Sequence, residues 1–453
     1  MEKELEGPIG TSKEMYKRVI DMAWPAVLES VLVGLTGVAD TLMVSVLGTA
    51  PMAAVGLVTQ PKFILLAVIM SLNVGVTAVV SRRAGEGDFD SANRCMRQCI
   101  LLGTLLAALM SVLGYVFAEQ ILWFAGAEAD TIVDATNYLR IIAVGQFFQS
   151  VSLIINAAQR GVGNTRIAMT TNVTANLVNI LFNYLLITGH LGFPALAVRG
   201  AAIATALGQF IAFLMAMKSI LDGHSRLYVH WGQSWKLEKR MMQSVCSVSS
   251  SSFVEQIFNR IGFLTFAIIV AKLGTEAFAA HQVSMNISSL TFNCVDGLSA
   301  ASAALVGQAL GARRPDLASI NAKICQRIAF CFSVVLSLCL VIFGRVIAGW
   351  FTKDPVICQW IVEVLWTIAI FVYAQCSGAV WAGSLRGAGD TKFVALVSFC
   401  SIMAVRPLLG YLLAYPVGLG LLGAWIAIGI DQYTRFILTS WRMSTGKWKS
   451  IRL

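Results

Sequence analysis

Long apolar segments recur along almost the whole chain, separated by short polar connections. About 20 helical residues cross the hydrocarbon core of a bilayer, and a segment in lipid must satisfy its own backbone hydrogen bonds. Charged residues make up only 13% of the chain and hydrophobic ones 57%, whereas roughly a quarter of a soluble domain is charged. The sequence therefore predicts an all-α polytopic membrane protein.

Twelve apolar segments are long enough to be membrane-spanning helices, and several exceed the minimum length and are expected to tilt. They are expected at residues 19–47, 53–81, 95–118, 134–158, 167–189, 201–218, 241–272, 276–310, 324–346, 356–384, 393–415 and 423–441.

Lysine and arginine gather at both termini and in every second connection between these segments. The alternate connections carry only Arg199, Lys272, Arg345 and Lys353. Since cytoplasmic loops are enriched in basic residues, both termini are expected in the cytoplasm and the chain in the cell (inner) membrane. The net charge of +10 follows from this orientation, so the lipid bilayer is the expected partner and nucleic acid is not.

The sequence repeats itself at an offset of 226 residues. The clearest copies are the turns "RGVGNT", which begins at Arg160, and "RGAGDT", which begins at Arg386. Further pairs at this offset, or after small shifts, are Glu29 with Glu255, Gln149 with Gln375, "LGT" at 47–49 with 273–275, and "NYLL" at 183–186 with "GYLL" at 410–413.

This repeat predicts two pseudo-symmetric six-helix lobes in the same membrane orientation, with a cleft at their interface. We expect an N-lobe at residues 1–222, a cytoplasmic linker at 223–240 and a C-lobe at 241–453. In each RG-x-G turn, glycine permits a tight reversal, and arginine is expected to hold the turn at the lipid headgroups. A phosphate-binding loop is not expected, because the turns lack a GK[ST] ending and follow no strand.

Two carboxylates lie in the first apolar segment, Asp40 and, eleven residues earlier on the same helical face, Glu29. An ionisable residue at the centre of a membrane helix costs about 2.5–3.5 kcal/mol on insertion scales. Asp40 is either a structural carboxylate held by hydrogen bonds or a cation or proton site. We favour the second reading, because no basic residue lies near it in its own segment. Glu29 fits both readings equally.

The fifth segment carries Asn172, Asn176, Asn179 and Asn183. Their spacing of 4, 3 and 4 residues places all four on one face of a helix. A single intramembrane asparagine usually bridges to a neighbouring helix, whereas four in register predict the wall of a wet cavity.

The second half has its own intramembrane polar residues, which are Glu255, Asn259, Arg260, Asp296, Gln375 and Arg406. Either the two carboxylates pair with Arg260 or Arg406 in structural ion pairs, or they line a cavity of net negative charge that attracts organic cations. Lys62 is expected to extend toward the membrane surface. No catalytic or metal-binding constellation is apparent, so an enzyme is not expected.

The sequence resembles the multidrug and toxic compound extrusion (MATE) transporters, in particular their NorM-like branch. The resemblance rests on Pro25, Asp40 and Leu47-Gly48 at family spacing, "AAHQ" at 279–282, "VGQALGA" at 306–312 and the two RG-x-G turns. It covers essentially the whole chain.

The resemblance implies a MATE/MOP-type fold of two lobes arranged as a V, and an antiporter that exports organic compounds in exchange for Na⁺ or H⁺. It places Asp40 on the family's N-lobe coupling aspartate and Pro25 on a helix bend. It also places Asn156, Asn179, Asn183 and Thr205 on the other N-lobe polar positions. The usual C-lobe carboxylates fall on Asn259 and Gln375 instead, which makes Asp40 the stronger candidate for coupling.

The sequence thus predicts a monomeric antiporter that exports cationic, aromatic compounds by alternating access. It uses no cofactor and no metal beyond Na⁺ at Asp40. Cavity residues are expected to be Glu29, Asn176, Glu255, Asn259, Asp296 and Gln375, with a hinge at Pro25. The alternatives are a flippase for a lipid-linked saccharide, which shares the lobed architecture, or a membrane-embedded enzyme.

Overall fold

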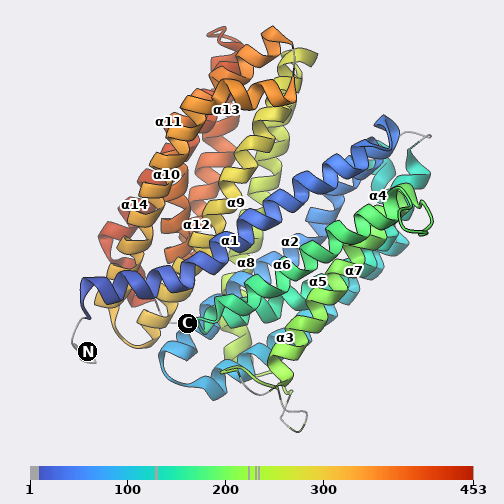
Figure 1. Cartoon of the computed structure of the whole chain (residues 1–453). Helices are drawn as coiled ribbons and strands as arrows, with labels where there is room; N and C mark the ends of the chain where they lie inside the picture. The colour runs from blue at the N-terminus through green and yellow to red at the C-terminus, as the bar shows by residue number, and fades with distance from the viewer. Residues whose placement is uncertain are drawn as a thin grey trace. The chain divides into compact units, whose positions relative to one another are not determined.

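A computed structural model describes residues 10–127, 131–222, 225–229, 232, 235–352 and 354–451, and within these ranges every regular element is a helix (Figure 1). The helices before residue 222 are α1 (Ser12–Ser45), α2 (Thr49–Gly85), α3 (Phe89–Val116), α4 (Ala118–Phe124), α5 (Ile132–Gly161), α6 (Thr165–Ile187) and α7 (Ala197–Leu221). The later α-helices are α8 (Lys239–Ala271), α9 (Thr275–Gly311), α10 (Pro315–Phe351), α11 (Pro355–Ala388), α12 (Thr391–Ser398), α13 (Arg406–Ala414) and α14 (Gly420–Thr445). A π-helix, η1 (Phe399–Val405), joins α12 to α13, and a 3₁₀ turn, η2 (Lys447–Ser450), follows α14.

Each predicted span corresponds to one of these helices, except the eleventh, which is built from α12, η1 and α13 in succession. Ten spans in the described part of the chain are long and apolar enough to cross a membrane. The two that fall short are α6, which carries the asparagine stripe, and α14, which carries Asp431, Arg435 and Arg442. The predicted all-α membrane fold is confirmed, and the two helices that fall short of a span carry buried polar residues.

Helix boundaries follow the local chemistry of the sequence. Gly48 and Gly274, equivalent by the 226-residue offset, precede α2 and α9 with φ angles of 104° and 112°, a backbone conformation that L side chains rarely adopt. Asp88 caps α3 by accepting a hydrogen bond from the Ser91 backbone N–H, which satisfies one of the free donors of the first turn. Proline stands in the first turn of α10 and α11, where its missing N–H has no cost.

Contacts within the chain define two units, one of residues 28–249 and one of residues 250–453 together with the chain up to Val27. Helix α1 therefore belongs to one unit before Val27 and to the other after it, two residues beyond Pro25. Helix α8 also changes unit: up to Ser249 it belongs to the unit of residues 28–249, and from Ser250 it belongs to the other unit. The lobe boundaries predicted at 222 and 241 stay a prediction, and part of the linker 223–240 lies outside the described residues. The hinge at Pro25, inside α1, likewise stays a prediction.

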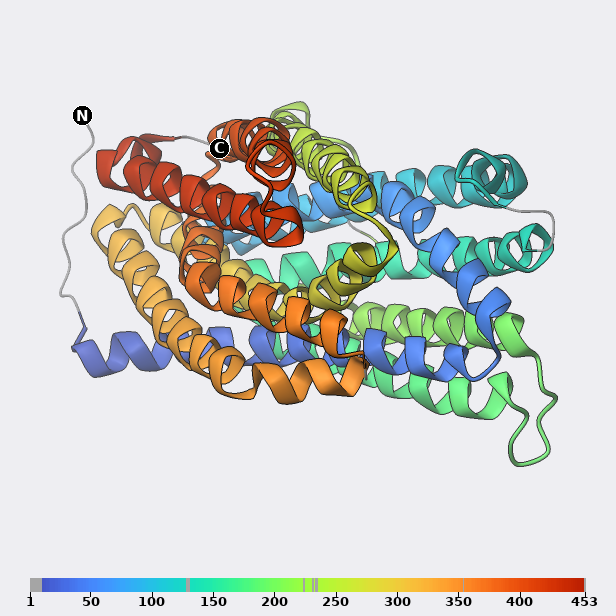
Figure 2. The same cartoon turned by 90° about the horizontal axis from the view of Figure 1, so that it is seen from above.

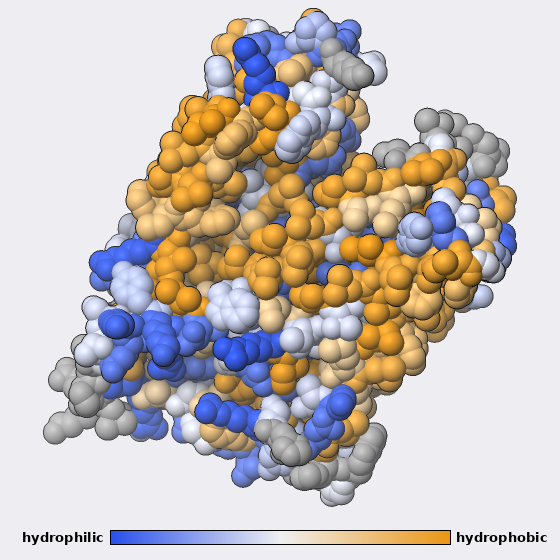
Figure 3. Space-filling model, in the orientation of Figure 1, coloured by the Kyte–Doolittle hydropathy of each residue, from blue (hydrophilic) through white to orange (hydrophobic). Residues whose placement is uncertain are grey.

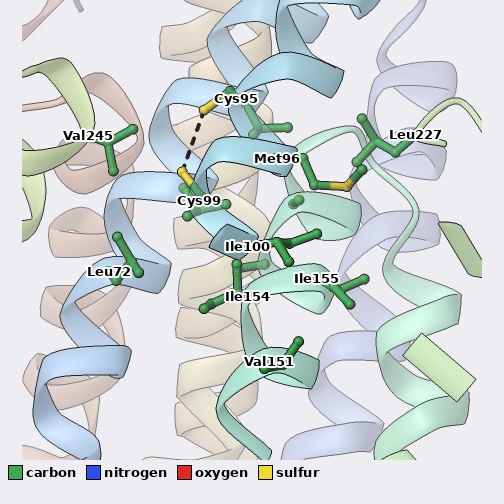
Figure 4. Packing of buried hydrophobic residues seen from close by; sticks show 14 of the residues in the cluster. Leu72, Cys95, Met96, Cys99, Ile100, Val151, Ile154, Ile155, Leu227 and Val245 are labelled. Atoms are coloured by element: carbon green, nitrogen blue, oxygen red, sulfur yellow. Dashed lines mark hydrogen bonds between the residues drawn. The ribbon is translucent and has the colours of Figure 1, made fainter. Parts of the chain in front are cut away.

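The core of the unit of residues 28–249 is built from small and branched side chains of α2, α3, α5 and α7 and of the start of α8. Figure 4 shows part of this packing, in which Ile154 and Ile155 of α5 lie near Cys99 of α3. Cys95 and Cys99 are free, fully buried thiols one turn apart on α3, with their Sγ atoms 3.9 Å apart. In the same unit, α6 and α7 lie side by side (Figures 1 and 2).

Large hydrophobic side chains are exposed along many helices, including Leu42, Leu105, Leu264, Ile342 and Ile370, each more than 60% accessible. Figure 3 shows hydrophobic residues covering much of the visible helix surface, with hydrophilic residues gathered mainly toward helix ends. Soluble monomers rarely expose apolar patches of this extent. Such a surface is suited to contact with lipid.

Candidate functional site

Asp40 lies in α1 and faces α6, which supplies two amides to its carboxylate. Asn183 Nδ2 donates to Asp40 Oδ1 over 2.6 Å. With the side-chain amide of Asn179 oriented nitrogen-first toward Asp40, its nitrogen lies 2.7 Å from the same oxygen. Both asparagines are buried, so half of the predicted asparagine stripe serves this one carboxylate.

Helix α7 approaches α6 closely enough to bring a hydroxyl to this site. A Cβ atom on Gly208 would lie 2.6 Å from the backbone oxygen of Ala175, so only glycine permits this helix spacing. One turn earlier on α7, the Thr205 hydroxyl lies 3.1 Å from the side-chain amide of Asn179. Tyr138 of α5 is hydrogen-bonded to Thr205 in turn, and this chain of polar groups links four helices around Asp40.

A cavity of about 160 Å³ opens beside Asp40 within the unit of residues 28–249. Its walls come from α1, α2, α5, α6 and α7, and its lining residues are Asp40, Thr41, Val44, Val55, Gly56, Thr59, Tyr138, Asn183, Ala201 and Thr205. A drug-sized ligand needs roughly 300–1,000 Å³, whereas each water occupies about 30 Å³. The cavity therefore has the size for a small ion and a few waters.

The polar atoms around the cavity are mainly oxygen acceptors. The carboxylate of Asp40 and the hydroxyls of Thr41, Thr59 and Tyr138 belong to its lining residues, and Asn183 Oδ1 is buried without a hydrogen-bond partner. Oxygen ligands of this kind suit a hard cation, and a carboxylate can equally bind a proton. The residues present thus fit Na⁺ or H⁺ alike.

The same place in the second half of the chain is apolar. The 226-residue offset carries Asp40 onto Phe266, and the matched segments "NYLL" and "GYLL" carry Asn183 onto Gly410. Phe266 packs against Gly410, with a ring carbon 3.4 Å from the position of a Cβ on that glycine. The apolar contact between Phe266 and Gly410 therefore takes the place that the hydrogen bond between Asp40 and Asn183 has in the first half.

The remaining wall of the site is replaced in the same way. Tyr138 corresponds to Val364, which is buried in a hydrophobic cluster with Phe266 and Trp425. His281 fills the space among the rings, with its centroid 5.6 Å from that of Phe266 and 5.7 Å from that of Trp425. A polar cavity of the Asp40 kind thus exists in one half of the repeat, and its place in the other half is filled by aromatic side chains.

Glu29, the other carboxylate of α1, belongs to a separate group. It accepts hydrogen bonds from Arg160 of the first RG-x-G turn (Oε1–Nη1, 3.1 Å) and from Asn172 of α6 (Oε1–Nδ2, 2.5 Å). Its other oxygen, Oε2, is buried without a hydrogen-bond partner. Glu29 thus fastens the end of α5 to α1.

The second half repeats this arrangement in the same register. Glu255 of α8 accepts from Arg386 of the second RG-x-G turn (Oε1–Nη2, 2.5 Å) and from the hydroxyl of Ser398 (3.4 Å). The sequence separations, 131 and 143 residues, equal those in the first half. We call the two groups the Glu–Arg clasps, the first being Glu29, Arg160 and Asn172 and the second Glu255, Arg386 and Ser398.

The clasps involve the turn arginines, which are expected at the lipid headgroups. Both guanidinium groups fold back onto a buried glutamate, with only 17% and 27% of the Arg160 and Arg386 side chains exposed. Charged residues in membrane-spanning segments usually pair with one another. The structure thus gives both arginines a buried partner that the sequence analysis did not predict, and their place at the headgroups stays a prediction.

The remaining polar residues of the second half form another buried network. Arg406 pairs with Asp431 of α14, not with Glu255 or Asp296 as one reading of the sequence expected. Arg435 lies 3.5 Å from the same carboxylate and donates to Asn259 Oδ1 over 3.3 Å. Asn259 is therefore tied to an arginine.

The other predicted site residues lie apart from Asp40. Asn156 is fully buried in α5 and lies 3.5 Å from the Ser152 hydroxyl. It is 18 residues beyond Tyr138 on the same helix, or about 27 Å at 1.5 Å per residue, so the structure does not bring it to the Asp40 cavity. Gln375 donates to Thr291 over 3.1 Å.

Two further residues predicted to line the cavity, Asn176 and Asp296, lie in different surroundings. Asn176 lies on α6 between the Asp40 site and the first clasp, and its Nδ2 atom is buried without a hydrogen-bond partner. Asp296 lies on α9, where its accessible side chain interacts electrostatically with Arg386 and Glu255. It adds one negative charge beside the second clasp.

Sequence reasoning missed three residues of these sites. Tyr138 and Thr59 are ordinary residues of apolar segments, and no local pattern marks them. Asp431 is different, because an aspartate within a membrane-spanning segment always needs a partner, and that signal was available.

Together, the membrane-spanning helices and the small polar site inside one bundle of them define a multi-pass membrane transporter. Residues 25–185 and 251–412 match the MatE family. The chain belongs to that family, and the predicted NorM-like assignment is confirmed by its relatives.

Among these relatives is the probable multidrug resistance protein NorM of Thermotoga maritima, 28% identical over 96% of this chain and 94% of that protein. Multidrug resistance protein PmpM of Pseudomonas aeruginosa is 24% identical over 87% of this chain and 83% of its own length. Relatives of this kind are transporters and not enzymes, in agreement with the sequence analysis.

Solved structures show the same fold. A multidrug resistance MATE family transporter of the MOP superfamily, in an outward-facing conformation, superposes with a TM-score of 0.89 at 21% identity, covering 98% of this chain and all of that one. A MOP superfamily transporter from Pyrococcus furiosus gives the same TM-score and identity over 96% of this chain and 97% of its own.

Proposed function

We propose that this chain is a secondary antiporter that exports organic compounds in exchange for Na⁺ or H⁺, and that the coupling ion binds at Asp40. The observation that carries the proposal is a carboxylate inside a membrane helix, held by asparagine amides at the wall of a cavity of about 160 Å³. A cavity of that size takes an ion, so the exported compound binds elsewhere.

The names of the relatives, which include several multidrug resistance proteins, support drugs or other toxic compounds as the exported class. Cationic, aromatic compounds fit the accessible carboxylate of Asp296, which lies in the membrane-spanning part of α9. The proposed cycle is alternating access, in which ion binding at Asp40 favours the state that releases the exported compound. Both termini would lie in the cytoplasm, by the distribution of basic residues.

The test is efflux of a fluorescent cationic dye from cells that express the wild type or Asp40→Asn, with Na⁺ and pH gradients imposed separately. We expect one gradient to drive efflux by the wild type, and Asp40→Asn to abolish the response to it at equal expression. Asp90→Asn, which removes the same charge from an exposed position at the start of α3, is the matched control and should behave as the wild type.

If Asp40→Asn responds to the gradient as the wild type does, Asp40 is structural and the proposed coupling site is wrong. If neither protein moves dye under any gradient, the drug-export proposal falls. Transport of a lipid-linked saccharide then becomes the next hypothesis to test.

A further inference from the structure

A lysine lies beside the Asp40 cavity within the membrane-spanning part of α2. Gly56 and Thr59 of that helix line the cavity, and Lys62 follows Thr59 by three residues, so it lies on the same helical face one turn further on. The Lys62 and Asp40 side chains interact electrostatically. The Lys62 backbone carbonyl accepts a hydrogen bond from Gln146 Nε2 of α5 over 3.0 Å, which fixes the base of the lysine side chain.

The internal repeat shows that these two charges occur together. By the 226-residue offset, Asp40 corresponds to Phe266 and Lys62 to Ser288, which is buried in α9. The half that lacks the carboxylate therefore lacks the ammonium group as well. A lone lysine inside a membrane helix is costly, and a nearby carboxylate removes much of that cost. The pattern fits a functional pair better than a lysine that extends to the membrane surface.

The surroundings of Asp40 contain no other source of positive charge among the described residues that act on it. On α2 the charged neighbour is Lys62, and on α5 the titratable neighbour is Tyr138. Helices α6 and α7 contribute the uncharged side chains of Asn183 and Thr205. When no external cation is bound, Lys62 is thus the group that balances the Asp40 carboxylate.

We propose that Lys62 is a tethered counter-cation that competes with the coupling ion for Asp40. The proposal rests on the proposed function, in which Asp40 binds that ion. A Na⁺ ion or a proton that binds Asp40 is repelled by the nearby ammonium group. Lys62 therefore lowers the affinity of the site for the coupling ion. With Lys62 charged, a monovalent cation leaves the site with one net positive charge and a divalent cation leaves it with two, so Lys62 disfavours a divalent cation more strongly, which makes it a specificity-determining residue.

The test is cation binding by the purified, full-length protein in detergent, read as thermal stabilisation during a Na⁺ titration at fixed pH. A second arm follows the pH midpoint of stabilisation in Na⁺-free buffer. Removing a unit positive charge that acts on Asp40, in an environment of effective dielectric constant near 20, should tighten binding by about tenfold or more. We therefore expect Lys62→Gln to lower the half-saturating Na⁺ concentration by that factor, or to raise the pH midpoint by about one unit.

Lys62→Arg keeps the charge and should retain the wild-type value, and Ser288→Gln, at the equivalent position of the other half, should leave it unchanged. If Lys62→Gln fails to fold, Lys62→Met and the doubly neutral Asp40→Asn/Lys62→Gln replace it. In the double variant, cation stabilisation should be absent. If Lys62 had only a structural role, replacing it would weaken cation binding or leave the affinity unchanged. Either result overturns the proposal.

The two proposals fail separately. If Asp40→Asn keeps full cation stabilisation and gradient response, the coupling site is wrong and the Lys62 proposal falls with it. If Asp40→Asn loses both while Lys62→Gln binds the cation as the wild type does, only the role of Lys62 is refuted.

Discussion

Replacing Asp431 by asparagine should strongly destabilise the unit that contains residues 250–453, because this one carboxylate lies against two arginines. Asp431 is completely buried, and its partner Arg406 is only 1% exposed. Arg406 donates to Asp431 through Nε over 2.9 Å and also through Nη2. Its Nη1 atom is already buried without a hydrogen-bond partner. In Asp431→Asn the guanidinium group would remain buried with no counter-charge of its own.

Breaking a buried ion pair by removing one partner costs about 3–5 kcal/mol. For a unit of this size, each kcal/mol shifts the midpoint of thermal unfolding by about 2–4 °C, so the midpoint of Asp431→Asn should fall by roughly 6–20 °C. The assay is the fraction of detergent-solubilised protein that stays monodisperse after heating.

Two controls separate the charge effect from a general loss of packing. Arg406→Met combined with Asp431→Asn removes both charges and should recover most of the loss, since apolar replacements of buried pairs are often close to neutral. Asp90→Asn, at an exposed site, should unfold as the wild type does. The reasoning is refuted if Asp431→Asn unfolds within about 2 °C of the wild type.

Two further predictions concern helix ends. Glu29→Gln and Glu255→Gln each remove the charged acceptor of one Glu–Arg clasp, so each should cost about 1.5–3 kcal/mol; thermal unfolding of both variants checks this, and a large loss in one with none in the other would contradict the equivalence of the clasps. Asp88→Ala should cost about 1 kcal/mol by removing the N-cap of α3. The hydroxyl and backbone N–H three residues on donate to Asp88 and hold its pKa below its ordinary value, so this stability is present above the unfolded pKa and is lost as the pH falls through the folded pKa. The gap between the wild type and Asp88→Ala should thus be constant near neutral pH and close below about pH 4, and a gap that widens in acid would exclude the cap as its cause.

The helices could be predicted from the sequence because apolar length alone decides what crosses a membrane. Even α6 and α14, which fall short of the hydropathy of a membrane span, were predicted as apolar segments, and the repeat agrees with a fifth and a sixth helix in each half. The partner of each buried charge was harder to predict. One of the two readings left open paired Glu255 or Asp296 with Arg260 or Arg406, and the other placed both carboxylates in a cavity of net negative charge.

A signal for the correct partner was nevertheless present. Glu29 with Glu255 and Arg160 with Arg386 both occur at the 226-residue offset, and pairs that repeat together are candidates for contact. The interpretation of the arginines as headgroup anchors hid that signal. For Lys62 no such signal existed within its own helix, because its carboxylate lies on α1 and only the folded structure brings the two helices together.

The π-helix η1 explains why the offset between the halves changes inside one helix. The offset is 226 at Asn172 and Ser398, which occupy the same place in the two clasps, and 227 at Asn183 and Gly410. Between these positions the first half has the uninterrupted α6, while the second has the seven π-helical residues of η1. A π-turn accommodates one additional residue within a continuous helix.

The two halves therefore differ by a single residue that is accommodated within a membrane-spanning helix and not in a loop. Each residue advances an α-helix by about 100°, so without the π-turn every side chain beyond the insertion would point in a new direction. The π-turn confines that rotation, and the rest of the helix keeps the orientation of its counterpart in the first half of the repeat. The one-residue difference between the two halves of the repeat is thus visible in the hydrogen-bonding pattern of one helix.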